Sequence, residues 1–250
     1  MRLVKNRKLY DKVIHSVNQK LKESSYNGDV ISLLHGTDAI IFGGAVRDSI
    51  AELPVNDIDI LSFGQSFQII SEKVRMNIAQ NAEEYAHLRL PGSHYFTVYE
   101  DTTSVIQVIT PSTYQILKNE INATNFIVNI LSNVDISNSG VAIMPQKYPG
   151  YIIETVYEAI RDAENKEFRL TQGLMTTERL QGRINKFKNR GWKERFIPIG
   201  SFFIGNSSDT YLIDDISFDS LILEDKLNPL ALYLTLGKGH NIFERKKEDA

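Results

Sequence analysis

Two aspartates, Asp57 and Asp59, lie two positions apart in the segment D-I-D-I-L at residues 57–61. Because side chains alternate between the two faces of a β-strand, this spacing places both carboxylates on one face and the isoleucines on the other. Hard divalent cations such as Mg²⁺ prefer oxygen ligands, and two ions held about 4 Å apart need acidic groups that reach both. The pair indicates metal-dependent phosphoryl transfer, although paired aspartates are also common on exposed strands.

A short strand, a tight turn and a helix are expected directly before this pair. Residues 39–42 form an apolar run typical of a buried strand, and Gly43 and Gly44 allow a sharp turn because neither carries a Cβ. Residues 45–53 have apolar side chains at helical spacing, and Pro54 ends that helix. We therefore expect the glycine turn to lie next to the two aspartates.

The glycine turn suits a triphosphate. Phosphate oxygens can approach backbone N–H groups at Gly43 and Gly44, at the start of a helix whose dipole favours anions. Arg47 can neutralise part of the phosphate charge, and Asp48 orients Arg47 or caps the helix. These four residues are the candidate nucleotide-binding residues of this segment, and their order before the aspartates is more specific than the aspartate pair alone.

Flanking elements are expected on both sides of this segment. Residues 1–38 should be mainly helical, with a short second helix that Asp29 caps and that runs through Leu34. The first helix has a basic face, and its apolar positions are Leu9, Val13, Val17 and Leu21. We expect it to pack beside the sheet that carries the aspartates.

Beyond the aspartates, helical and extended patterns alternate. Residues 94–100 and 105–110 are rich in β-formers and are separated by D-T-T-S, which predicts a hairpin. Short strands are expected between residues 134 and 150. Apolar spacing predicts helices over 66–86, 152–160 and 176–190.

The motifs G-G-A-V-R-D at 43–48 and D-I-D-I at 57–60 resemble the head domain of bacterial-type CCA-adding enzymes and poly(A) polymerases, in the polymerase-beta-like nucleotidyltransferase superfamily. The resemblance implies an α+β fold. A head of mixed sheet with flanking helices would cover residues 1–140. A smaller, mainly helical neck-like region and a C-terminal extension would cover residues 141–250.

The same resemblance implies a function. A nucleoside monophosphate would be transferred from an NTP, ATP or CTP, to an acceptor, most often the 3′ hydroxyl of a tRNA-like RNA. Asp57 and Asp59 would be catalytic and would hold two Mg²⁺ ions. Further nucleotide-binding candidates are Asn125 and Asn129, in a segment similar to the family's R-R-D-F-T-x-N-A-L helix, and Arg183 and Lys186, which loosely match its R-x-x-R-F neck helix.

Several positions depart from the family pattern. Gln107 stands where the family has a third acidic residue, and a neutral amide can bind a cation or a water but cannot act as a general base. Ala123, Thr124 and Asn125 replace R-R-D, and Lys186 replaces an arginine. The loss of these charges leaves nucleotide affinity and base choice open.

Composition limits the class of protein. With 250 residues, of which 42% are hydrophobic, the chain can bury a substantial core. It has no cysteine, which excludes disulfides and thiolate zinc sites, and its five histidines show no ligand spacing. No apolar run has membrane-spanning length and the N-terminus lacks a signal-peptide core, so a cytoplasmic protein is expected. The net charge of −3 argues against bulk nucleic-acid coating, and the oligomeric state is left open.

Two other functions compete with transfer to RNA. In the first, the fold is retained as a catalytically weakened protein that binds RNA or nucleotides, which Gln107 and Asn125 favour and the intact D-I-D opposes. In the second, the enzyme is active but transfers the nucleotide to a protein or a small molecule.

Overall fold

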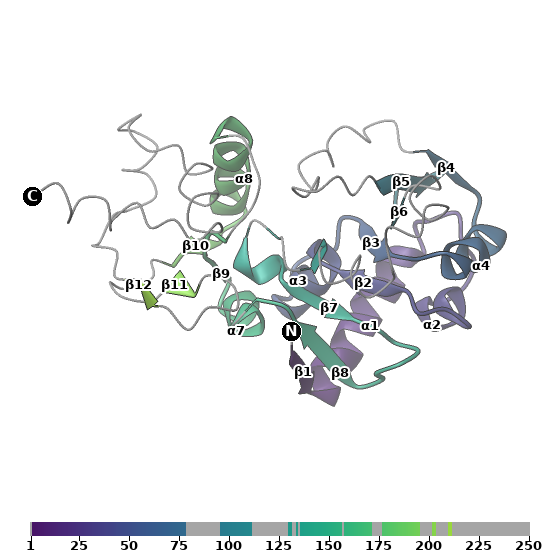
Figure 1. Ribbon diagram of the computed structural model, residues 1–250, viewed down its shortest axis with the longest axis horizontal. Helices are drawn as coiled ribbons and strands as arrows, with labels where there is room; N and C mark the ends of the chain where they lie inside the picture. Colours follow the sequence, from purple (N-terminus) through teal and green to yellow (C-terminus); the bar gives the residue numbers. More distant parts are fainter. Residues whose placement is uncertain are drawn as a thin grey trace, which may run out of the picture.

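The computed structural model describes residues 2–78, 96–111, 130–131, 134, 136–156, 158–171, 177–195, 202–203 and 210–211. A mixed eight-stranded sheet with flanking helices occupies the centre of this part of the chain (Figure 1). The α+β class expected from the sequence, with a mixed sheet and flanking helices, is confirmed. No helix among these residues is long and apolar enough to cross a membrane.

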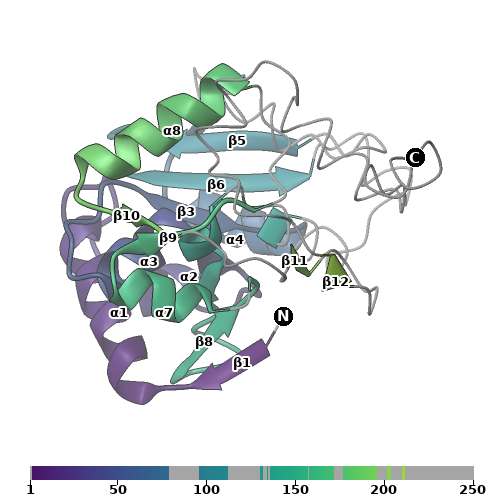
Figure 2. The ribbon, with the colours of Figure 1, turned by 90° about the vertical axis from the view of Figure 1, so that its left-hand side faces the viewer.

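The central sheet brings together strands from both ends of the described chain. All neighbouring pairs are antiparallel except β3 and β6, which run parallel. Figure 2 shows β3, β6 and β5 as successive neighbours. In spatial order the strands are β1 (Arg2–Lys5), β8 (Tyr151–Glu154), β7 (Val141–Ile143), β2 (Ile40–Phe42), β3 (Ile58–Leu61), β6 (Ile106–Pro111), β5 (Phe96–Asp101) and β4 (Met76–Ile78).

Helices cover one face of this sheet. Ile58 and Ile60 of β3 point into the core that these helices form, whereas Leu61 belongs to a second apolar cluster on the opposite face. The helices are α1 (Arg7–Leu21), α2 (Val30–Leu34), α3 (Gly44–Ile50), α4 (Gln65–Lys73) and α7 (Ala159–Glu164). Asp59 lies on the face opposite these helices, because it alternates with the two isoleucines.

Helix α8 (Thr177–Asn189) attaches to the end of α3. It contributes Ile184 and Phe187 to a third apolar cluster, which also contains Trp192 and, from the head, Ala51. The remaining elements are short: η2 (Ser137–Ser139), β9 (Glu167–Phe168), β10 (Lys193–Glu194), β11 (Phe202–Phe203) and β12 (Thr210–Tyr211). This cluster fixes α8 beside the helix that follows the glycine turn.

Several sequence predictions are confirmed. The four apolar positions of α1 are buried in the core that includes β3, and Asp29 caps α2 by accepting a hydrogen bond from the Ser32 backbone at 2.7 Å. The predicted hairpin is β5 and β6, and the predicted strand at 39–42 is β2. The predicted helix at 176–190 is α8.

Three predictions of local structure were wrong. Residues 2–5 form an edge strand in a segment expected to be helical, and α4 ends at Lys73 instead of continuing through residue 86. Residues 151–154 form β8 instead of starting a helix. Ile152 and Ile153 are both buried, on opposite faces of the sheet, so the same apolar residues fit a strand once β7 offers an edge. The sheet therefore continues beyond residue 140, where the head had been expected to end.

Asp101 stabilises the β5–β6 hairpin. This buried carboxylate accepts hydrogen bonds from the backbone of Ser25, Val105 and Ile106 and from the hydroxyls of Ser25 and Thr103. Burial alone would raise the pKa of Asp101, but these hydrogen bonds outweigh it and hold the pKa below its ordinary value.

Asp101→Asn should lower the free energy of unfolding at pH 7 by about 1–3 kcal/mol, because the donors lose a charged acceptor. A depressed pKa in the folded state adds stability above the unfolded pKa, and this stability disappears as the pH falls through the folded value. The difference between wild type and variant in urea unfolding should therefore be largest near pH 7 and shrink below about pH 4. A difference that does not change with pH would show that the charge of Asp101 is not what stabilises the hairpin.

Candidate active site

The glycine turn and the aspartates meet at one end of β2 and β3. A Cβ placed on Gly43 would stand 3.9 Å from Oδ2 of Asp59, and a Cβ placed on Gly44 would stand 3.8 Å from Oδ1 of Asp57. The cause is the antiparallel pairing of β2 with β3, in which Phe42 lies opposite Asp59, so the turn after Phe42 passes over both carboxylates. The structure thus brings together the two motifs that were singled out in the sequence.

The backbone conformation of this turn requires a glycine at position 43. Its φ of +65° lies in the region that disfavours residues with a Cβ, and it directly precedes the first residue of α3. Helix α3 has only seven residues, so its dipole is short, and nearby positive side chains are the main source of attraction for an anion.

Asp59 is electrostatically perturbed. Its Oδ1 is buried and has no hydrogen-bond partner among the described residues. Burial and, after it, the negative charge of Asp57 raise the pKa of Asp59, while the positive charges of Arg183 and Arg47 lower it, and the net result is a pKa of about 7. An acid with an unsatisfied oxygen and a raised pKa next to a second acid is typical of a functional site.

The donor set fits Mg²⁺. No cluster of three or more acidic or histidine side chains that could hold a metal occurs in the described part of the chain. Mg²⁺, however, is commonly held by one or two carboxylates and completes its octahedron with water and substrate phosphate oxygens. Asp57 and Asp59 supply those two carboxylates, and the unpartnered Oδ1 of Asp59 is an oxygen that a cation would satisfy.

Gln107 is the direct neighbour of Asp59. In the parallel pair of β3 and β6 these residues are opposite each other, and Glu100 of β5 lies opposite Gln107 on the far side. Cross-strand partners face the same side of a sheet, so Asp59, Gln107 and Glu100 form one polar row. Gln107, which the sequence places where the family has a third acidic residue, thus lies beside Asp59, and Glu100 is a member of the row that sequence reasoning did not identify.

Arg47 is more constrained than expected. Its side chain is 6% exposed, its Nε donates to Oδ1 of Asp48 at 2.7 Å, and its Nη1 donates to Oγ of Ser139 at 3.1 Å. Its Nη2 lies 3.7 Å from the position of a Cβ on Gly44 and is the guanidinium nitrogen nearest the turn. Of the two roles predicted for Asp48, orientation of Arg47 is the one that this geometry supports.

The remaining predicted nucleotide-binding residues are two on α8 and two outside the described part of the chain. Arg183, on α8, acts electrostatically on Asp59 and so belongs to the site region, whereas Lys186 is exposed on the same helix. Asn125 and Asn129 lie outside the described residues. Those two positions therefore stay predictions from the sequence.

Besides Glu100, sequence reasoning missed four residues around Arg47 and Asp48: Ser139, Phe187, Arg190 and Trp192. Oγ of Ser139 accepts the hydrogen bond from Arg47, and Nη2 of Arg190 donates to Oδ2 of Asp48 at 2.9 Å. The rings of Phe187 and Trp192 lie against the Arg47 guanidinium. Phe187 belongs to the R-x-x-R-F match, but no local signal links these residues to Arg47, because at least 92 positions separate the bonded pairs.

No protein-family model matches the chain, and no curated protein sequence matches it. Among solved structures, it is similar to a CCA-adding enzyme with CTP at 15% identity and TM-score 0.45, covering 78% of this chain and 44% of that one. A tRNA-processing enzyme in an apo form is similar at 18% identity and TM-score 0.42, covering 78% and 46%. A Thermotoga maritima CCA-adding enzyme complexed with tRNA is similar at 15% identity and TM-score 0.43, covering 78% and 44%. The chain spans less than half the length of these proteins, and similarities of this size do not assign a function to it.

Proposed function

We propose that this protein is a metal-dependent nucleotidyltransferase that moves a nucleoside monophosphate from an NTP to an acceptor hydroxyl. The observation that carries the proposal is that the Gly43–Gly44 turn faces both carboxylates: a Cβ on Gly44 would lie 3.8 Å from Oδ1 of Asp57, and one on Gly43 would lie 3.9 Å from Oδ2 of Asp59. A carboxylate pair that can hold cations and a turn without side chains that can admit phosphates are the two components that the reaction needs.

Each residue has a stated role. Gly43 and Gly44 leave space for the triphosphate, and Arg47 and Arg183 supply positive charge that offsets its negative charge. Asp57 and Asp59 would hold two Mg²⁺ ions, which, when bound, would stabilise charge on the phosphates and favour loss of the acceptor hydroxyl's proton to water. The acceptor oxygen forms a bond to the α-phosphorus, the bond between the α-phosphorus and the oxygen that bridges it to the β-phosphate breaks, and pyrophosphate leaves.

The proposed acceptor is the 3′ hydroxyl of a tRNA-like RNA, and the proposed donors are ATP and CTP. This choice depends on the motif resemblance at 43–48 and 57–60. The basic residues of α8, among them Arg183 and Lys186, are compatible with a polyanionic partner.

The test is to incubate the purified protein with Mg²⁺, each labelled NTP and total RNA, and to follow the label. Labelled RNA with release of pyrophosphate supports the proposal. Label on the protein or on a small molecule would identify a different acceptor. NTP binding without any transfer would support the second candidate function, a catalytically weakened nucleotide-binding protein, which the neutral amide of Gln107 beside Asp59 favours.

Gln107→Glu should lower the Mg²⁺ concentration that gives half-maximal NTP binding by roughly 10-fold. The reason is that residue 107 lies opposite Asp59 on the same face, and a hard cation gains more from a carboxylate than from an amide. The midpoint should be compared with wild type at equal ionic strength. Thr102→Glu, at an exposed position of the same hairpin, is a control for the added charge. An unchanged midpoint would place Gln107 outside the reach of the metal.

A further inference from the structure

Helix α8 is tied to the head by an ion pair between Arg190 and the buried Asp48, next to the candidate site. Asp48, which is 2% exposed, accepts a hydrogen bond from Nε of Arg47 through Oδ1 at 2.7 Å. Through Oδ2 it accepts a hydrogen bond from Nη2 of Arg190 at 2.9 Å. Because Arg190 directly follows α8, one carboxylate of α3 connects the head to the end of that helix.

Arg47 belongs both to this connection and to the site. Its guanidinium carbon lies 4.7 Å from the centre of the Phe187 ring and 5.5 Å from that of Trp192, distances typical of cation–π contacts. Its Nη2 lies on the Gly44 side, as described above. The rings of the α8 region therefore help to hold a cation that faces the proposed position of the phosphates.

Docking of α8 also places a second cation. Arg183 lies four residues before Phe187, on the same face of the helix, so the contact of Phe187 with Arg47 directs Arg183 toward the head. The electrostatic effect of Arg183 on Asp59 agrees with this placement. If α8 moved away, the site would lose Arg183 and the aromatic support of Arg47 together.

We propose that docking of α8 and binding of a polyphosphate stabilise each other through Arg47, with Asp48 and Arg190 as the positioning residues. The inference rests on the proposed function, which places the triphosphate at the glycine turn. A ligand shifts a conformational equilibrium only if it binds one state more tightly, and the docked state offers it two oriented cations. Coupling is reciprocal, so docking raises polyphosphate affinity by the same factor by which polyphosphate favours docking, typically 5- to 150-fold, and a weakened tie lowers the affinity by up to that factor.

The substitution Asp48→Asn distinguishes a role of Asp48 in positioning Arg47 and α8 from a purely electrostatic effect of its negative charge. If Asp48 acted only as a nearby negative charge, its removal would make an anion bind more tightly. If it positions Arg47 and α8, its removal makes the same anion bind more weakly. The two explanations therefore predict changes of opposite sign for one substitution.

Arg190→Met is the second variant, because Arg190 is partly exposed and its loss leaves Asp48 paired with Arg47. Lys188→Met is the matched control. It removes one positive charge from the same helix, but Lys188 is exposed and its ion pair is with Glu194, not with Asp48. Circular dichroism and thermal unfolding show whether each variant is folded.

The measurement is calorimetric titration with inorganic tripolyphosphate and with ATP, together with the fluorescence of Trp192, the only tryptophan of the chain. We expect a saturable change in Trp192 fluorescence in the wild type. Both Asp48→Asn and Arg190→Met should bind each anion at least about 5-fold more weakly, and Lys188→Met should stay within about 2-fold of wild type.

Other results would overturn the inference. Tighter binding by Asp48→Asn, an Arg190→Met effect no larger than that of Lys188→Met, or binding that leaves Trp192 fluorescence unchanged would each remove the coupling while leaving the proposed function intact. A wild-type protein that binds neither anion, with or without Mg²⁺, would overturn the proposed function itself, and the coupling with it.

Discussion

Replacing Asp57 or Asp59 by alanine should reduce nucleotide transfer by well over 100-fold. Loss of a residue that only hydrogen-bonds to a metal ligand typically lowers metal affinity or activity 10- to 100-fold. A larger loss is expected here, because these carboxylates are proposed as the ligands themselves. The measurement is the initial rate of labelled NMP incorporation at saturating NTP over a range of Mg²⁺ concentrations. Asp11→Ala, which removes an exposed aspartate of α1, is the control and should keep the wild-type rate.

The loss of activity should not come from loss of folding. A carboxyl whose folded pKa is raised stabilises the fold below its unfolded pKa, and this contribution is lost as the pH rises through the folded value, about 7 for Asp59. Above pH 7 without divalent cations, wild type therefore carries a buried charge that Asp59→Asn lacks. The variant should have a melting temperature equal to or above that of wild type at pH 8. Transfer activity that survives both alanine substitutions would remove the two-metal proposal.

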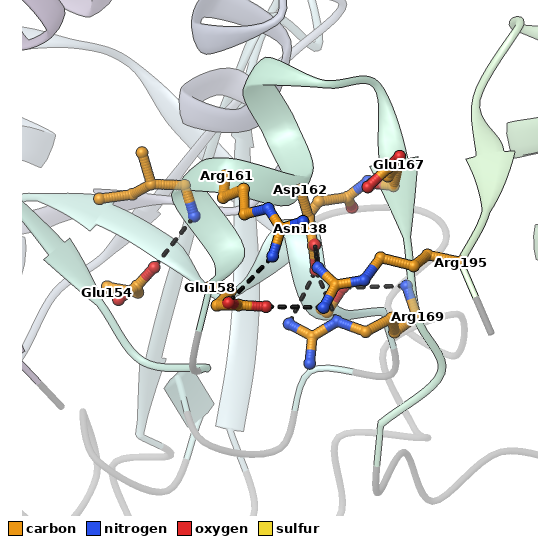
Figure 3. A network of polar contacts seen from close by, with 10 residues as sticks. Asn138, Glu154, Glu158, Arg161, Asp162, Glu167, Arg169 and Arg195 are labelled. Carbon is orange, nitrogen blue, oxygen red and sulfur yellow. Dashed lines mark hydrogen bonds and ion pairs between the residues drawn. The ribbon is translucent and has the colours of Figure 1, made fainter. Parts of the chain in front are cut away.

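Asp162→Ala should lower the free energy of unfolding by roughly 3–5 kcal/mol, the cost typical of breaking a buried ion pair on one side. Asp162 is fully buried in α7 and joins three other segments, as Figure 3 shows. One carboxylate oxygen accepts hydrogen bonds from the Ser137 hydroxyl at 2.6 Å and Nε of Arg169 at 2.8 Å. The other accepts from Nη1 of Arg195 at 3.0 Å.

Removal of this carboxylate would leave the Ser137 hydroxyl and the Arg169 guanidinium without the buried acceptor that they share. Urea unfolding followed by circular dichroism measures the change. Asp11→Ala again serves as the control, since its ion pair with Arg7 is exposed and should contribute less than about 0.5 kcal/mol. Similar losses for both variants would show that the Asp162 network contributes no more than a surface pair.

The centre of the site could be predicted from the sequence because its determinants are local. The strand, the glycine turn, the short helix and the aspartate pair follow one another within residues 39–61, and each has a period or a turn residue of its own. Antiparallel pairing of two successive strands then brings the turn to the aspartates with little freedom. The same locality explains why α1, the β5–β6 hairpin and α8 were predicted correctly.

The strands toward the two ends of the sheet could not be predicted in this way. The segments at 2–5, 76–78 and 151–154 carry apolar residues compatible with more than one structure, and each becomes a strand because a neighbouring strand offers unpaired backbone groups. Which edges are available depends on the whole sheet. The continuation of the sheet beyond residue 140 follows from the same cause.

The electrostatic setting of the site was likewise decided by tertiary structure alone. Asp48 contacts a residue 142 positions away, and Ser139 bonds Arg47 across 92 positions, so no spacing in the chain signals either contact. The raised pKa of Asp59 depends on its burial and on the charge of Asp57, offset by cations that include Arg183 on a helix far along the chain. The sequence by itself determined which groups can perform the chemistry, because residue type and local spacing are sufficient for that. Their burial, their charge partners and the attachment of α8 depend on contacts between distant segments, which only the folded chain specifies.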